Sequence, residues 1–221
     1  LDTGAMIGRL FTRSKPIVPA TSVSAPTESY HDRLRQYSLM MEFQKLSDEI
    51  PSGMYIVPDL DNISIWHGVI FVQHGIYRRA ILTFILQFPD SFPETCPIVK
   101  FSSSVFHPMI DPESGLVDLS SFNNWQPNGN VANLLIFVKS IIDSTDMWER
   151  DLPSNSEALN LWNKDVSLYQ QQVDLCVMRS LDRLYLTENN SSIKFSRPQQ
   201  DHQLLWRRIQ KGDNIWDWIA A

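Results

Sequence analysis

The sequence is poor in cysteine and in long apolar runs, and it has no excess of basic charge. It contains only two cysteines, Cys96 and Cys176, which excludes a disulfide framework and a paired-cysteine zinc site and indicates a reducing compartment. The net charge of −6 argues against nucleic acid as a direct partner, because phosphate binding needs a basic face. No apolar run is long enough to span a bilayer and no secretory signal opens the chain, so we expect a cytoplasmic protein without a transmembrane segment.

The histidines outside the central motif described below, namely His31, His67, His74 and His202, show no metal-ligand spacing. We therefore expect no metal site, and nothing in the sequence calls for a cofactor.

The composition that is present suits one globular domain with an extension at each end. The hydrophobic content is 43% and the charged content 20%, both ordinary for such a domain. The first 30 residues are rich in proline, serine and threonine and have no sustained period, which predicts a flexible arm. We place the folded domain at residues 31–186 and a C-terminal extension at residues 187–221.

Hydrophobic periodicity predicts an α+β fold. Leu39, Phe43, Leu46 and Ile50 recur at helical spacing, with Met40 beside them, and predict a packing helix over residues 31–50. Short apolar runs bounded by turn residues then predict four strands, at 54–57, 63–72, 80–88 and 97–102. The tight His74-Gly75 connection suits an antiparallel hairpin.

The third predicted strand alternates, with Ala80, Leu82, Phe84, Leu86 and Phe88 on one face. Helical spacing resumes at residues 130–143 and again at 156–169. A continuation through Val173, Cys176, Val177, Leu181 and Leu184 keeps the helical spacing. The expected layout is thus an N-terminal helix, a four-stranded antiparallel meander and C-terminal helices.

The central motif couples a His-Pro turn to a glycine, a short apolar run and a Trp-x-Pro. The segments occur in this order: Phe88-Pro89 with Pro93 and Pro97, then Phe106-His107-Pro108-Met109, then Gly115-Leu116-Val117-Asp118-Leu119, then Trp125-Gln126-Pro127. Together they resemble the active-site region of ubiquitin-conjugating enzymes, in which His-Pro-Asn precedes a glycine, an aliphatic residue and the catalytic cysteine. The resemblance implies a UBC-like fold in which Asp118 stands in the place of the cysteine and Met109 in the place of the asparagine.

These two departures would remove the chemistry. Carrying ubiquitin as a thioester requires a thiolate, which accepts the acyl group and leaves readily. A carboxylate at Asp118 would give a mixed anhydride that water destroys, and Met109 has no N–H for the developing oxyanion. We therefore expect no enzyme activity and a degenerate site of Asp118, Met109, His107 and Trp125, with His107 in the structural role that the resemblance implies.

Other candidate groups have competing interpretations. Cys96, among prolines, is either a displaced nucleophile or a bystander outside the motif. Cys176 shares an apolar helix face and is expected to pack. Asp111 and Glu113 with Asp118 form either an acid–base cluster or a solvated loop, and the sequence favours the loop.

Finer motifs resemble the fused-toes (Akt-interacting protein, crossbronx-like) family of inactive ubiquitin-conjugating variants. The segments that carry this resemblance are Leu39-Met40-Met41-Glu42-Phe43, Gly53-Met54-Tyr55-Ile56-Val57-Pro58, Trp66-His67-Gly68-Val69-Ile70-Phe71 and His74-Gly75-Ile76-Tyr77. Membership implies an adaptor that joins a Hook-type coiled-coil protein and a Hook-interacting protein, and so links endosomal cargo to dynein. The resemblance also implies a cytoplasmic location at the endosome surface and allows a nuclear pool. Some members of the family are implicated at telomeres and in Akt signalling, and the sequence does not separate these roles from transport.

The alternative is a variant that binds ubiquitin or assists an active ubiquitin-conjugating enzyme in chain formation. The C-terminal extension is open to two interpretations as well. Trp206, Trp216 and Trp218 either dock back onto the domain or form a partner-binding segment, since tryptophan is a favoured interface anchor.

Overall fold

The computed structural model describes residues 30–122, 125, 130–145, 153–185, 192–197 and 207. Its elements are α1 (Tyr30–Glu49), β1 (Met54–Pro58), β2 (Ile65–Phe71), β3 (Ile81–Gln87), β4 (Ile98–Phe101), α2 (Val131–Asp143), α3 (Ser156–Lys164) and α4 (Val166–Arg183). The strands form one antiparallel sheet in chain order, β1-β2-β3-β4. This confirms the predicted helix, four-stranded meander and C-terminal helices.

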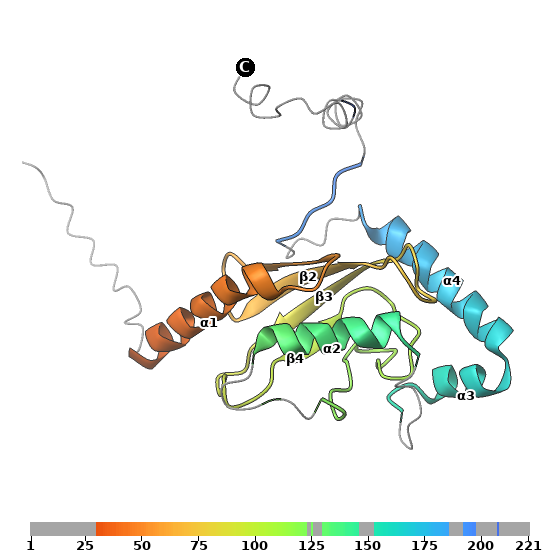
Figure 1. The fold of residues 1–221 in the computed structure, drawn as a ribbon, viewed down its shortest axis with the longest axis horizontal. Helices are drawn as coiled ribbons and strands as arrows, with labels where there is room; N and C mark the ends of the chain where they lie inside the picture. The colour runs from red at the N-terminus through yellow and green to blue at the C-terminus, as the bar shows by residue number, and fades with distance from the viewer. Residues whose placement is uncertain are drawn as a thin grey trace, which may run out of the picture.

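The core lies between the inner face of the sheet and α2. Figure 1 shows α2 running along the sheet, with α1 and α4 at opposite ends of the molecule. The alternation predicted for β3 is confirmed, because Leu82, Phe84 and Leu86 are all buried. The apolar face of α2 meets them, and its buried residues are Val131, Ala132, Leu134, Leu135, Val138, Ile141 and Ile142.

Helix α1 buries a narrower face than its spacing predicted. Leu39 and Leu46 are buried, but 60% of Met40 and 36% of Phe43 are exposed. A carboxylate, that of Glu42, is also buried on this face of α1. Glu42 is 7% exposed, and its Oε1 accepts a hydrogen bond from the backbone N–H of Val131 at 2.9 Å. Because the first N–H groups of a helix have no partner inside it, Glu42 joins α1 to the start of α2.

The prediction of one continuous helix from Ser156 to Leu184 is wrong at Asp165. The backbone there leaves the helical region, with φ −149° and ψ 86°, and α3 ends before it. The Asp165 carboxylate accepts a hydrogen bond from the N–H of Leu168 at 3.0 Å and so caps α4, as aspartate commonly does. Helical spacing of apolar residues on both sides of Asp165 concealed this break.

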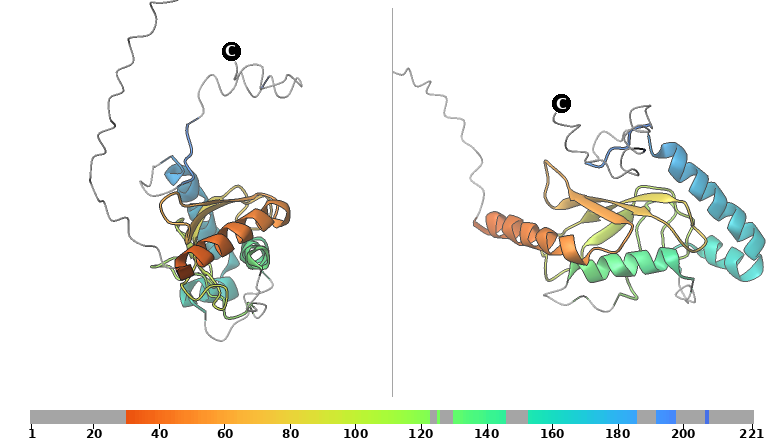
Figure 2. Two further views of the ribbon diagram at one scale, coloured as in Figure 1. Left: turned by 90° about the vertical axis from the view of Figure 1, so that its left-hand side faces the viewer. Right: turned by 45° about the horizontal axis from the view of Figure 1, so that its top comes forward.

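The outer face of the sheet is crossed by residues 192–197. Figure 2 shows this segment on the side of the sheet opposite α2. The Phe195 ring meets the Phe71 ring of β2 edge to face, with centroids 6.3 Å apart. Trp206, Trp216 and Trp218 lie outside the described residues, so their docking stays a prediction, as do the domain boundaries. Among the helices of the described ranges, none combines the length and the apolarity that crossing a bilayer would require.

Candidate functional site

The loop after β4 folds back along the edge of the sheet. The N–H of Phe101 donates to the carbonyl of Gly115 at 2.8 Å, and the N–H of Val117 donates to the carbonyl of Val99 at 3.0 Å. Gly115 has a φ of +76°, and a Cβ there would lie 2.2 Å from the Phe101 carbonyl oxygen. Only glycine fits this position, so Gly115 determines where the following residues, up to Asp118, are placed.

His107 is fully buried and holds the loop against α2. Its Nδ1 accepts from the backbone N–H of Met109, and its Nε2 donates to the carbonyl of Ile141, both at 2.9 Å. Burial lowers the pKa of His107 from 6.5 to about 3, because the low-dielectric interior disfavours the imidazolium. The imidazole is therefore neutral at physiological pH and has the structural role that was expected.

Two tyrosines hold the loop immediately before His107. The hydroxyls of Tyr77 and Tyr169 both donate to the carbonyl oxygen of Phe106, at 2.5 and 3.1 Å. The two hydroxyl oxygens lie 3.0 Å apart, and burial raises the pKa of both phenols. Sequence reasoning assigned neither tyrosine to the site, although Tyr77 belongs to the His-Gly-x-Tyr turn that it had noted.

Met109 and Asp118 are neighbours through the backbone. The N–H of Asp118 donates to the carbonyl of Met109 at 2.8 Å. The Met109 side chain is completely buried in the core, and a thioether there fills space without offering a hydrogen-bond donor. The two residues that were expected to replace the asparagine and the cysteine of the ubiquitin-conjugating pattern thus lie side by side.

Trp125 packs on a different part of the loop region. Its Nε1 donates to the carbonyl of Pro93 at 2.9 Å, and its ring lies 6.0 Å from the ring of Phe92. It therefore joins the proline-rich connection between β3 and β4 to the segment that leads into α2. Of the four residues predicted for the site, His107, Met109 and Asp118 are joined by hydrogen bonds. Trp125 contacts the connection between β3 and β4 instead.

The carboxylates of the loop cap turns. Oδ1 of Asp111 accepts from the N–H and the hydroxyl of Ser114, at 2.7 and 2.6 Å, and these bonds lower the pKa of Asp111. Oδ1 of half-buried Asp118 accepts from the N–H of Ser120 at 2.8 Å. Each aspartate thus stabilises a local turn, and Glu113 is exposed, so this geometry fits turns better than an acid–base cluster.

Neither thiol is prepared for nucleophilic chemistry. Cys96 is half-buried, and burial raises its pKa to about 11, so that almost none of it is thiolate at neutral pH. Cys176 is 4% exposed on the inner side of α4, which confirms its packing role, and burial also raises its pKa.

Comparison with known proteins places this geometry in a family. Residues 38–177 match the family described as ubiquitin-conjugating enzyme. The crossbronx homolog of Anopheles gambiae is 34% identical over 160 residues, which cover 69% of each chain. AKT-interacting protein is 35% identical in Xenopus tropicalis, over 72% of this chain and 56% of that one. In Rattus norvegicus it is 32% identical, over 83% of this chain and 65% of that one. The chain thus spans less than two thirds of these AKT-interacting proteins.

A solved structure described as a novel ubiquitin-conjugating enzyme superposes with a TM-score of 0.56 at 24% identity. The match covers 68% of this chain and 99% of that one. At this identity the likeness establishes the fold alone, and that fold is UBC-like, as the motifs had predicted.

Proposed function

The chain belongs to the ubiquitin-conjugating enzyme family, together with AKT-interacting protein and the crossbronx homologs, and from that premise we propose that it is a non-catalytic adaptor. The observation that carries the proposal is the pair Met109 and Asp118. A buried thioether and a turn-capping carboxylate stand where an active member needs an amide and a thiol, and they are joined by a 2.8 Å backbone hydrogen bond.

The chemistry of the other nucleophiles supports the same proposal. Transfer of ubiquitin through a thioester requires a thiolate, and burial raises the pKa of both cysteines. Incubation with activating enzyme, ubiquitin and ATP should therefore give no reducible adduct on a non-reducing gel. A reducible adduct that disappears in Cys96→Ser would refute the proposal.

The partners that we propose are a Hook-type coiled-coil protein and a Hook-interacting protein, in a complex that connects endosomal cargo to dynein. This part rests on the fused-toes resemblance, and the name of the relatives, AKT-interacting protein, refers to a protein partner of those proteins. We place the protein in the cytoplasm at the surface of endosomes, held there through these partners.

Helix α1 offers a surface that suits a coiled-coil partner. Outside its buried stripe, Tyr37 and Met40 are 62% and 60% exposed. Leu34 and Met41 flank them and are 46% and 39% exposed. Exposed apolar residues at helical spacing are typical of helix–helix recognition, and a contiguous apolar patch commonly marks an interaction site.

A pull-down with the C-terminal region of a Hook protein tests both the partner and the surface. Met40→Asp should abolish capture, because it places a charge in the apolar contact. Met178→Asp is the matched control, since Met178 is 61% exposed on α4, and it should bind like the unaltered protein. Failure of the unaltered, folded protein to bind would exclude a Hook partner.

The alternative function gives a different result. If the chain binds ubiquitin or assists an active ubiquitin-conjugating enzyme, then ubiquitin should shift its NMR resonances, or the chain should raise the rate of chain formation. Either outcome, combined with no Hook binding, would replace the adaptor proposal.

A further inference from the structure

Helix α4 and the residues just after it carry an apolar stripe on the side that faces away from the domain. The side chains of this stripe are between 36% and 61% exposed, and they are Leu168, Leu175, Met178, Leu181 and Tyr185. They follow one another at spacings of three, four or seven residues, which places them on one side of the helix. The buried residues of α4 occupy the opposite side, and they are Tyr169, Val173, Cys176 and Ser180. An apolar stripe of this kind is typical of a helix that packs against another helix.

Two carboxylates lie on the same side of α4 as the stripe. Asp174 and Asp182 are four residues before and four residues after Met178, and residues four apart on a helix are neighbours on its surface. Nε2 of Gln170 donates to Oδ1 of Asp174 at 3.0 Å. Within the described part of the chain neither aspartate forms an ion pair. The outer side of α4 is therefore apolar with negative charge, and a segment that complements it should be apolar with positive charge.

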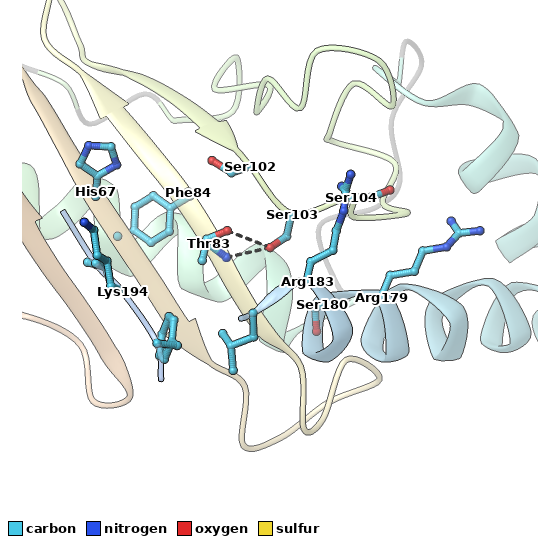
Figure 3. Close-up of a pocket in the computed structure, with 14 residues that line it drawn as sticks. His67, Thr83, Phe84, Ser102, Ser103, Ser104, Arg179, Ser180, Arg183 and Lys194 are labelled. Atoms are coloured by element: carbon cyan, nitrogen blue, oxygen red, sulfur yellow. Dashed lines mark hydrogen bonds between the residues drawn. The ribbon is translucent and has the colours of Figure 1, made fainter. Parts of the chain in front are cut away.

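The segment that crosses the sheet, residues 192–197, brings the chain back to the C-terminal end of α4. Its residues 193–195 line one small pocket together with Arg183 and Leu184, at the end of that helix (Figure 3). The Arg197 guanidinium then lies over the Tyr185 ring, 5.9 Å from its centroid, which is within the range of a cation–π contact. Because Tyr185 is the last residue of the stripe, the segment ends beside the stripe.

The sequence a few residues further on is apolar and basic. Residues 203–211 contain four large apolar side chains, Leu204, Leu205, Trp206 and Ile209. They also contain three cations, Arg207, Arg208 and Lys211, and no carboxylate. Arg207, the one residue of this stretch that the structure describes, is helical and exposed. Gly212 follows Lys211, as glycine commonly follows the end of a helix. The stretch thus has the chemistry that complements the outer side of α4.

We propose that residues 203–211 form a helix that docks on the outer stripe of α4 within the same chain. Nine helical residues are about 14 Å long, and the stripe from Leu175 to Tyr185 is about 15 Å long, so the two lengths match. Residues 198–202 separate the end of the crossing segment from the proposed helix, and five extended residues span about 17 Å. This connection is long enough to bring Trp206 onto Met178.

The tether and the charges favour this occupant over a second copy of α4. A segment held by so short a connection has an effective concentration of about a millimolar, which a second copy does not reach in dilute solution. Two α4 helices packed through their stripes would also bring the carboxylates of Asp174 and Asp182 close to those of the other copy, and like charges oppose such pairing. The cations of residues 203–211 have the opposite effect.

Limited digestion with trypsin tests the docking on the whole chain. Arg207, Arg208 and Lys211 are trypsin sites inside the proposed helix, so docking should slow cleavage at all three. Met178→Asp places a charge in the apolar contact and should speed this cleavage about ten-fold, because cleavage follows the population of the open form. Mass spectrometry gives the rate at each site, with cleavage at Arg13 as the internal standard. Equal rates in Met178→Asp and in the unaltered protein would overturn the proposal.

Further variants separate docking from other causes of faster cleavage. Trp206→Ser alters the extension instead of the domain and should speed cleavage about as much as Met178→Asp. The double variant should be no faster than either single variant, because both changes remove the same contact. Met40→Asp is the matched control, since Met40 is 60% exposed on α1, and it should leave the rates unchanged. Faster cleavage in Met40→Asp would show that added charge alone is responsible and would overturn the site.

Sedimentation velocity distinguishes the same chain from a second copy as the occupant of the stripe. The protein should sediment as a monomer, and the cleavage rates should not depend on protein concentration. Slower cleavage at high concentration, together with a dimer, would assign the stripe to a second copy and overturn docking within one chain. These results are independent of Hook capture, which uses α1 in the function proposed above.

Discussion

The backbone N–H of Asp118 donates to the carbonyl oxygen of Met109 at 2.8 Å. The N–H of Met109 in turn donates to Nδ1 of His107. Nε2 of His107 then donates to the carbonyl oxygen of Ile141, which belongs to α2. One chain of hydrogen bonds thus runs from Asp118 to the core helix α2. These residues therefore stabilise the fold whether or not the protein is a catalyst.

Replacing Met109 by asparagine should destabilise the fold. The Met109 side chain is fully buried, so Met109→Asn would place an amide among apolar groups, at a cost of about 1–3 kcal/mol. The volume-conserving Met109→Leu should cost less than about 1.5 kcal/mol. Urea unfolding measures both, and equal stability of the two variants would show that the site already accommodates a polar group.

Removing His107 should cost more than removing an exposed histidine. His107→Ala leaves the Met109 N–H and the Ile141 carbonyl buried without their partner, which we expect to lower the free energy of unfolding by about 2–4 kcal/mol. His74 is exposed in the turn between β2 and β3, and His74→Ala should change it by less than about 0.5 kcal/mol.

The low pKa of His107 predicts that stability depends on pH. The folded-state pKa of His107 is about 3, below its ordinary value of 6.5, so the unfolded chain takes up this proton first as the pH falls. The contribution of His107 is complete above pH 6.5 and declines below it by up to about 1.4 kcal/mol per pH unit. Between pH 7 and 5, the free energy of unfolding of the unaltered protein should fall as the pH falls. In His107→Ala it should fall less steeply over the same range. Equal slopes would contradict the buried neutral imidazole.

The contact between α1 and α2 can be tested in the same way. Glu42→Ala removes the acceptor for the Val131 N–H and should destabilise the protein by about 1–2 kcal/mol. Glu42→Gln keeps an acceptor oxygen and should cost less. Asp48, exposed on the same helix, is the control, and Asp48→Ala should be close to neutral. If Glu42→Ala were as mild as Asp48→Ala, the cap would contribute nothing.

The cysteines should react slowly with alkylating reagents. With a pKa of about 11, Cys96 has roughly 200-fold less thiolate at pH 8 than free cysteine. The higher nucleophilicity of a more basic thiolate offsets part of this difference. Alkylation by iodoacetamide should therefore be about ten-fold slower than for free cysteine, and its rate should rise with pH beyond 9. A rate equal to that of free cysteine would indicate an activated thiol.

The sequence predicted the parts of the fold that depend on local periodicity. The alternation of β3 and the apolar face of α2 follow from spacings of two and of three to four residues, and both are buried as predicted. The break at Asp165 could not be predicted in this way, because apolar spacing continues across it. An aspartate inside such a pattern is compatible with either a solvent-facing residue or a cap.

In the candidate site, too, some residues could be predicted from the sequence and others could not. The motif pointed to His107, Met109 and Asp118, and the structure brings them together. The groups that hold them lie far away in the chain. Tyr169 reaches the Phe106 carbonyl from 63 residues away, and Glu42 caps α2 from 89 residues away. Such pairs depend on tertiary proximity, which periodicity in one segment does not contain.

The loop that carries Asp118 also covers the outer edge of β4, through the bridge between Lys100 and Leu116. An uncovered edge strand presents unpaired N–H and C=O groups to any other extended chain and invites self-association. By pairing with this edge, the loop keeps the sheet from joining the sheet of another copy. Protection of the β4 edge against self-association is therefore a reason to keep this loop that does not depend on any reactive group in it.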